Sequence, residues 1–231
     1  MKLKITIVGE CDEGRLARSS IVPALGHAAL AIGKKISCRW LASEQVDDKI
    51  LRESHGIFVA PGSPFEEVKG ILDAIHFART QEVPCLGTCG GFQRIVMEFA
   101  ARELGLESIA HQELEPDAVD PFFSAMKCSL VGEEAVVNLI DNTFVSGIYG
   151  TNSVKEYFYC GYGIGNSYLP ILEKSELAVS GFDTNGEARV VELTNHPFFV
   201  GTLFVPQVNS SHDSPHPLLV AFVKAISSGA S

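Results

Sequence analysis

The sequence predicts an α/β protein in which a doubly wound, mostly parallel sheet carries helices on both faces and gains antiparallel additions in its second half. Two patterns support this fold class. Up to about residue 107, short apolar segments alternate with longer segments of helical periodicity, which is typical of βαβ units. Beyond that point, short apolar segments follow one another with tight turns between them, as antiparallel strands do. No linker, repeat or low-complexity segment divides the sequence, so we expect a single domain over residues 1–231.

Strands and helices are expected to alternate in the first part of the chain. The expected strands are short, apolar segments at residues 3–8, 35–41, 56–60 and 83–87. The expected helices are residues 16–32, 64–79 and 91–104. Because parallel strands need right-handed crossover connections, these elements should form a sheet with helices on both faces.

The second part of the chain is expected to add antiparallel strands. They are residues 125–131, 135–140, 144–149, 177–182, 188–193 and 199–204. Turn sequences such as Asp183-Thr184-Asn185-Gly186 separate them. A final helix over residues 218–226 completes the expected fold.

The charge balance argues against nucleic acid as a partner. The chain has 18 Lys and Arg against 28 Asp and Glu, a formal net charge of -10, and no run of five basic residues. A nucleic-acid binder must neutralise closely spaced phosphates with a basic face, which this composition does not provide.

We expect a cytoplasmic protein that uses neither a metal nor another cofactor and does not bind a membrane. The apolar segments stay far below the roughly 18 residues of a membrane span, and the first residues do not form a secretory signal. The six cysteines are scattered without zinc-ligand spacing, which favours a reducing compartment. A homo-oligomer is compatible with the sequence.

The strongest chemical signal is the segment Gly87-Thr88-Cys89-Gly90-Gly91. It places Gly-x-Cys-x-Gly between an expected strand and an expected helix, the pattern of a nucleophile elbow with cysteine as the nucleophile. The N–H groups at the start of that helix should point at Cys89 and lower the pKa of its thiol. The alternative interpretation is a tight turn that holds an ordinary buried cysteine.

Three motifs together resemble one family. The elbow, extended to Gln93, is similar to a Gly-x-Cys-x-Gly-x-Gln motif, and residues 59–63 (Val-Ala-Pro-Gly-Ser) are similar to a Pro-Gly-Gly oxyanion turn. Residues 195–218 resemble a C-terminal signature in order and spacing. These are motifs of the class I glutamine amidotransferases, with the glutaminase domain of CTP synthase as the most similar member. The resemblance covers nearly the whole chain and implies the fold of that family.

The resemblance also implies a site for acyl transfer with Cys89 as the catalytic nucleophile. The oxyanion hole would be formed by backbone N–H groups of Gly62, Ser63 and Gly90. Gln93 and Glu113 match positions that contact the glutamine substrate in the family.

The sequence departs from the family at the other two members of its catalytic triad. Val205 stands where the family has the general base His, and Gln207 stands where it has the Glu that orients that His. Valine cannot accept a proton from Cys89. The Arg-rich segment that grips the substrate carboxylate is replaced by the aromatic, uncharged residues 157–163. Tyr157, Tyr159 and Tyr162 either line the pocket or belong to a strand that packs in the core.

Two residues are candidates for a surrogate base. His212 lies in a polar loop after Gln207, next to Asp213, and Glu10 follows the first expected strand. The alternative is that His212 is a solvated loop residue and that Glu10 is a loop carboxylate or a helix cap. His111, close in sequence to Glu113, is a further candidate on the same reasoning.

The sequence therefore predicts a free-standing relative of the class I glutamine amidotransferases whose glutamine hydrolysis is impaired. One alternative is a Cys89-dependent hydrolase of another small amide or ester that uses a different base. Another is a non-catalytic relative that binds a metabolite or a partner protein. The expected ligand is glutamine or a related amide. Because no Gly-x-x-x-x-Gly-Lys-Ser/Thr loop occurs, we do not expect CTP synthesis by this chain, and a separate synthetase subunit would consume any ammonia formed.

Overall fold

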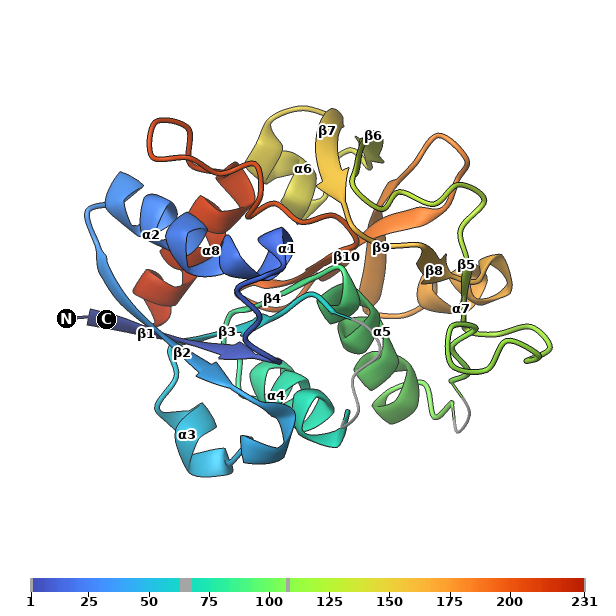
Figure 1. Cartoon of the computed structure of the whole chain (residues 1–231), viewed down its shortest axis with the longest axis horizontal. Coiled ribbons are helices and arrows are strands. Elements are labelled where there is room, and N and C mark those ends of the chain that lie inside the picture. The colour runs from blue at the N-terminus through green and yellow to red at the C-terminus, as the bar shows by residue number, and fades with distance from the viewer. Residues whose placement is uncertain (1, 63–67, 107–108, 231) are drawn as a thin grey trace.

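A computed structural model describes residues 2–62, 68–106 and 109–230 of the chain. Its main feature is a nine-stranded sheet with the strand order β2-β1-β3-β4-β11-β10-β9-β6-β7 (Figure 1). The strands of this sheet are β1 (Lys2–Val8), β2 (Lys35–Leu41), β3 (Gly56–Val59), β4 (Cys85–Thr88), β6 (Glu133–Leu139), β7 (Ser153–Phe158), β9 (Leu177–Phe182), β10 (Ala188–Leu193) and β11 (Phe199–Thr202). A separate two-stranded sheet pairs β5 (Phe123–Ala125) with β8 (Tyr162–Ile164).

Helices cover both faces of the main sheet. They are α1 (Leu16–Ser19), α2 (Ile21–Ala31), α3 (Asp48–Arg52), α4 (Lys69–Thr80), α5 (Gly90–Arg102), α6 (Phe144–Tyr149), α7 (Leu169–Leu172) and α8 (Pro217–Gly229), with short 3-10 turns at Ser43–Gln45 and Asn166–Tyr168. Helices α2 and α8 pack together on one face, and α4 and α5 pack together on the other (Figure 1).

The first five strands of the order, β2-β1-β3-β4-β11, pair in parallel. Every residue of β3, β4 and β11 is buried, because helices cover both faces of these central strands. The strands β11, β10, β9, β6 and β7 then pair antiparallel. The expected fold class, a mostly parallel doubly wound sheet with antiparallel additions, is thus confirmed.

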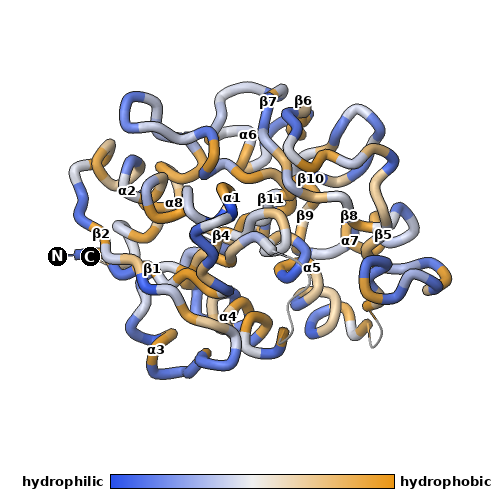
Figure 2. Tube along the Cα trace, viewed as in Figure 1, coloured by the Kyte–Doolittle hydropathy of each residue, from blue (hydrophilic) through white to orange (hydrophobic). Residues whose placement is uncertain are grey.

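The core lies between the central strands and the helices on either side. Hydrophobic residues concentrate along these inner elements, and hydrophilic residues along the outer loops (Figure 2). On the α2–α8 face, the ring of Phe222 contacts those of Phe58, at a centroid distance of 6.4 Å, and Phe198, at 5.3 Å. These aromatic contacts fix α8 against the strands that lead to the site.

One expected strand is wrong: residues 144–149 form the helix α6. Thr143 and Ser146 form a capping box, in which each side chain accepts a hydrogen bond from the backbone N–H of the other. Gly150 ends the helix in the left-handed region, with φ 67°. The apolar pattern of these six residues resembled that of a strand, whereas the capping residues on both sides favour a short helix.

Other boundaries differ from expectation. Of the strand expected at residues 125–131, only Ala125 belongs to a strand, the short β5, and β7 and β8 were not among the expected strands. The helix expected from residue 64 begins at Lys69, and residues 63–67 lie outside the described part of the chain. The hairpin turn at residues 183–186 joins β9 to β10 as expected.

The capping box of α6 gives a test of this correction. Replacing Thr143 by Ala removes the side chain that caps the first turn, and we expect the free energy of unfolding to fall by about 1 kcal/mol. Urea unfolding followed by circular dichroism measures the change. The control is Thr184→Ala at an exposed turn position, which should be nearly neutral. Equal effects of the two substitutions would contradict the capping role.

Candidate functional site

Cys89 occupies a strained turn between strand β4 and helix α5. Its backbone has φ 53° and ψ -111°, a conformation that residues other than glycine rarely adopt. Its N–H donates a hydrogen bond to the carbonyl of Thr202 on β11, at 2.8 Å, which anchors the turn to the centre of the sheet. Holding a residue in such a region costs of the order of 1–3 kcal/mol, so the surrounding packing must impose it.

The turn depends on a close backbone contact between two strand ends. A Cβ on Gly90 would lie 2.0 Å from the carbonyl oxygen of Gly62, which follows β3. Gly62 itself has φ 142°, and a Cβ there would lie 2.1 Å from the Nη2 of Arg18. Glycine is therefore required at both positions. The backbone N–H groups of Gly62 and Gly90 face the Cys89 sulfur and favour its negatively charged form.

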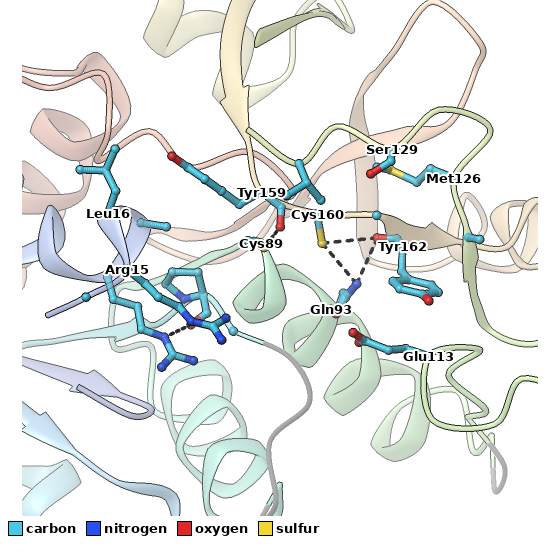
Figure 3. Close-up of a pocket in the computed structure, with 18 residues that line it drawn as sticks. Arg15, Leu16, Cys89, Gln93, Glu113, Met126, Ser129, Tyr159, Cys160 and Tyr162 are labelled. Carbon is cyan, nitrogen blue, oxygen red and sulfur yellow. Dashed lines mark hydrogen bonds between the residues drawn. The ribbon is translucent and has the colours of Figure 1, made fainter. Parts of the chain in front are cut away.

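A cavity of about 730 Å³ opens beside Cys89 (Figure 3). Residues 14–18 around helix α1 form one wall, and residues 159–162 after β7 form the opposite wall. Pro61 and Gly62 border the cavity next to Cys89, and Gln93 and Glu113 also line it. A cavity of this size suits a small-molecule ligand.

The proposed oxyanion turn packs against an arginine that the sequence analysis did not single out. The Nε of Arg18 donates a hydrogen bond to the carbonyl of Pro61, at 2.9 Å. Its guanidinium also lies 3.6 Å from the carboxylate of Asp12. Ser63, the third expected member of the oxyanion hole, lies outside the described residues.

Gln93 projects from α5 into the cavity wall and is held by internal hydrogen bonds. Its Nε2 donates to the carbonyl of Tyr162, at 3.0 Å, and its Oε1 lies 3.3 Å from the Nε2 of His111. The Nδ1 of His111 accepts a hydrogen bond from the backbone N–H of Glu113, so the proton of the neutral ring is on Nε2 and is donated to Gln93. His111 thus orients the side chain of Gln93 without itself lining the cavity.

His111 is neutral at ordinary pH. Burial lowers the pKa of its imidazole to about 4, and the positive charge of Arg94 acts in the same direction, whereas Glu113 opposes it.

The side chains of Val205 and Gln207, which the sequence analysis places at the triad positions of the family, are both buried. Val205 is inaccessible to solvent, and its N–H donates a hydrogen bond to the carbonyl of Tyr157, at 2.8 Å. The Nε2 of Gln207 donates to the carbonyl of Ala17, at 2.8 Å, and to the hydroxyl of Thr88, at 3.2 Å. Gln207 thereby ties helix α1 to the strand that leads into the elbow.

The structure does not bring the two candidate surrogate bases into the described lining of the cavity. The side chain of His212 is 75% exposed, and its Nδ1 lies 3.0 Å from Asp213. The side chain of Glu10 is 62% exposed and lies 3.8 Å from Arg18. Figure 3 shows Glu113, a carboxylate of the cavity wall, well apart from Cys89.

The aromatic segment 157–163 contributes to both the core and the cavity. Tyr159 and Tyr162 line the cavity, whereas Phe158 is buried against Phe204. Cys160, in the same segment, also lines the cavity and raises the pKa of Cys89. The sequence analysis missed this neighbour. The available signal was a cysteine within the segment that replaces the family's substrate-binding arginines.

The two cysteines alter each other's acidity. The pKa of Cys89 is raised well above its ordinary value by its interaction with the Cys160 side chain, by burial and by the negative charge that Cys160 acquires. The backbone N–H groups of Gly90 and Gly62 lower the pKa of Cys89, but by less than the other effects raise it. The pKa of Cys160 is lowered, first by its interaction with the Cys89 side chain. The direction for Cys89 is therefore opposite to that expected from the helix terminus alone.

Within the described part of the chain, no group of three or more His, Cys, Asp or Glu side chains is arranged to hold a metal ion. Among the same residues, no helix has the length and apolar character needed to cross a membrane.

The geometry described so far defines a class of protein. A cysteine elbow at the carboxyl end of a central parallel strand, facing backbone N–H groups and a small-molecule cavity, is the arrangement of an α/β protein built for nucleophilic chemistry on acyl groups. The family model of glutamine amidotransferase class-I matches residues 17–225. The chain belongs to the class I glutamine amidotransferases.

Individual relatives agree with this assignment. The chain is 32% identical to the CTP synthase of Cytophaga hutchinsonii over 238 residues, which cover 97% of this chain and 44% of the relative. It is 30% identical to the CTP synthase of Saccharolobus solfataricus over 242 residues, which cover 98% and 45%, respectively. The chain thus spans less than half the length of these curated relatives.

Solved structures share the fold. The glutaminase domain of Trypanosoma brucei CTPS with bound acivicin superposes with a TM-score of 0.88 at 23% identity, covering 98% of this chain and 94% of that one. A glutamine amidotransferase from Thermotoga maritima superposes with a TM-score of 0.59 at 11% identity, covering 90% and 77%.

The neutral, buried His111 makes stability depend on pH. Its pKa is 6.5 in an unfolded chain and about 4 in the folded protein, so the unfolded state binds the proton first as pH falls. This contribution to stability is present above pH 6.5 and is lost progressively towards pH 4. In His111→Gln, which retains a donor to Gln93, we expect a smaller fall in the free energy of unfolding over this range.

Urea unfolding at a series of pH values measures the difference between the two proteins. The control is His212→Gln, because His212 is exposed and should leave the pH profile unchanged. Parallel profiles for the wild type and His111→Gln would contradict the assignment of a neutral His111.

Proposed function

We propose that this class I glutamine amidotransferase domain binds glutamine or a related amide in the cavity beside Cys89 but hydrolyses it poorly. The observation that carries the proposal is the chemistry at the two replaced triad positions. Val205 is a buried apolar side chain, and Gln207 is engaged with Ala17 and Thr88. No histidine is among the described residues that line the cavity, so nothing there matches the imidazole of a cysteine–histidine pair.

The backbone groups that remain at the site determine how much catalysis we expect. Backbone N–H groups at Gly62 and Gly90 still favour negative charge at the site, which supports binding and partial stabilisation of an oxyanion. In hydrolases of this type, removal of triad members leaves about 10³–10⁴-fold acceleration over water from the oxyanion hole and binding alone. We expect that residual level, because neither His212 nor Glu10 belongs to the described lining.

The raised pKa of Cys89 supports the same conclusion. A thiol that resists ionisation is a poor nucleophile in the absence of a general base, since the thiolate is the reactive form. In the family's usual arrangement, a histidine removes this proton, whereas here the sulfur contacts the carbonyl of Tyr159, at 3.7 Å, and Cys160 raises the pKa of the thiol.

A second candidate function is Cys89-dependent hydrolysis of another small amide or ester. The retained elbow favours it, because Cys89 is still held at φ 53° at a cost that an ordinary core cysteine would not require. The uncharged wall with Tyr159 and Tyr162 suits a substrate without the carboxylate that a missing arginine would grip.

A synthetase region is the partner we propose for such a domain, either as a separate protein or as a further part of a longer chain. The support is the length of the CTP synthases to which the chain is similar, since the aligned region covers 44–45% of them.

Release of ammonia and glutamate from L-glutamine tests the proposed function. We expect the wild type to differ by less than about tenfold from Cys89→Ser, since the general base that would activate the thiol is absent. The paired substitution Val205→His with Gln207→Glu should raise turnover, and adding Cys89→Ser to that pair should abolish the increase. Calorimetric titration with L-glutamine tests binding separately.

Robust Cys89-dependent glutamine hydrolysis by the wild type would overturn the proposal. Absence of both turnover and glutamine binding, combined with Cys89-dependent cleavage of a simple thioester or p-nitrophenyl ester, would favour the second candidate.

A further inference from the structure

Two cysteine thiols from distant parts of the chain meet in the wall of the cavity. Cys89 lies at the N-terminus of α5, and Cys160 follows β7, yet both side chains line the same cavity, and each affects the acidity of the other. The Cys89 sulfur also lies 3.7 Å from the carbonyl oxygen of Tyr159, the peptide group that leads directly into Cys160 (Figure 3). This contact holds the Cys89 sulfur against the peptide group of Cys160, so the two thiols are neighbours in the cavity wall.

The polar surroundings of the pair favour one thiolate beside one thiol. The Nε2 of Gln93 donates to the Cys160 sulfur at 3.6 Å, and the backbone N–H groups of Gly62 and Gly90 face the Cys89 sulfur. Two adjacent negative charges would repel each other, so the pair loses its protons in two well-separated steps. A lowered pKa makes Cys160 the first to ionise, and the raised pKa keeps Cys89 protonated.

The pair is reachable by small molecules, unlike the cysteines of the core. Cys89 and Cys160 are each 6% exposed, and both line the cavity of about 730 Å³. By contrast, Cys85 is fully buried, and Cys38 does not line this cavity. Cys11 and Cys128 are exposed, and in the described residues neither contacts a second thiol.

We propose that Cys89 and Cys160 are a redox pair that a hydroperoxide converts into an intramolecular disulfide. This inference does not require glutamine hydrolysis and so stands apart from the proposed function. It assigns Cys160 as the thiolate that reacts with the peroxide and Cys89 as the resolving thiol.

The disulfide forms in two steps. The Cys160 thiolate attacks one oxygen of the hydroperoxide, the O–O bond breaks, and the leaving alkoxide or hydroxide takes up a proton, so that Cys160 becomes a sulfenic acid. The Cys89 sulfur then attacks the sulfenic sulfur, the S–O bond breaks, and the departing hydroxide leaves as water with the Cys89 proton. The two sulfurs together lose two electrons, and the peroxide gains them.

The disulfide would change the site in two ways. It would remove the Cys89 sulfur from the cavity as a nucleophile, and it would join the start of α5 covalently to the segment that carries Tyr159 and Tyr162. Thiol reductants would restore the open, reduced site.

Peptide mapping of the natively folded wild-type protein after treatment with hydrogen peroxide tests the proposal. We expect one linked peptide pair containing Cys89 and Cys160, with a mass about 2 Da below the sum of the free peptides, reversed by dithiothreitol. The linkage should be absent in Cys89→Ser and Cys160→Ser and unchanged in Cys128→Ser, the matched control. In Cys89→Ser, dimedone should trap a sulfenic acid on Cys160.

Two results would overturn the proposal. In the first, Cys89 and Cys160 stay reduced at peroxide concentrations that oxidise the exposed Cys128. This result counts against the proposal whether or not iodoacetamide labels the two cavity thiols. The other is a disulfide that links Cys89 or Cys160 to a different cysteine. The principal measurement uses the wild type, so a variant that fails to fold does not decide the outcome.

Discussion

The contact between the backbones of Gly62 and Gly90 is the constraint on which the site depends. Strands β3 and β4 are neighbours and end at the same edge of the sheet, so the segments that leave them must pass close together. The carbonyl of Gly62 occupies the space of a Cβ on Gly90, which forces the chain to turn sharply at Cys89. Strain at Cys89, the direction of its sulfur and the position of the facing N–H groups all follow from this contact.

The second element of the site is brought in by strand β7. Phe158 forms a bridge with Phe204, and the carbonyl of Tyr157 accepts a hydrogen bond from Val205. These contacts hold the end of β7 against the segment that follows β11, next to the elbow. The residues immediately after β7, including Tyr159 and Cys160, therefore form a wall of the cavity. Val205 is thus an attachment point for that wall.

Much of the fold could be predicted from the sequence because local pattern and global topology agree. Alternation of apolar strands and amphipathic helices accounts for the parallel part of the sheet, and the motif around Cys89 marks the elbow. The helix at residues 144–149 was misread because its apolar content dominated the pattern, while the capping role of Thr143 depends on hydrogen bonds that a hydropathy pattern does not contain.

The candidate site was less accessible to prediction, for a physical reason. Cys89, Gly62 and Gln93 belong to local motifs, so their roles can be inferred from the few residues around each of them. Cys89 and Cys160 are neighbours only because β7 packs against residues 204–205, and no local pattern records that pairing. Likewise, the predicted effect of the helix terminus on the Cys89 thiol was outweighed by a neighbour that lies far away in the sequence.

The site separates into a part made by backbone and a part made by side chains, and only the first follows from the fold. The strained turn and its N–H groups are made by the backbone, and they require glycine at positions 62 and 90. Proton transfer and recognition of a carboxylate need particular side chains, and at the positions that we expect to match those of the family the sequence has Val205, Gln207 and an aromatic segment. The fold therefore retains the capacity to hold a reactive sulfur and to stabilise negative charge. A second thiol, that of Cys160, lines the same cavity, so the chemistry proposed for the pair is the joint oxidation of two sulfurs by an external oxidant.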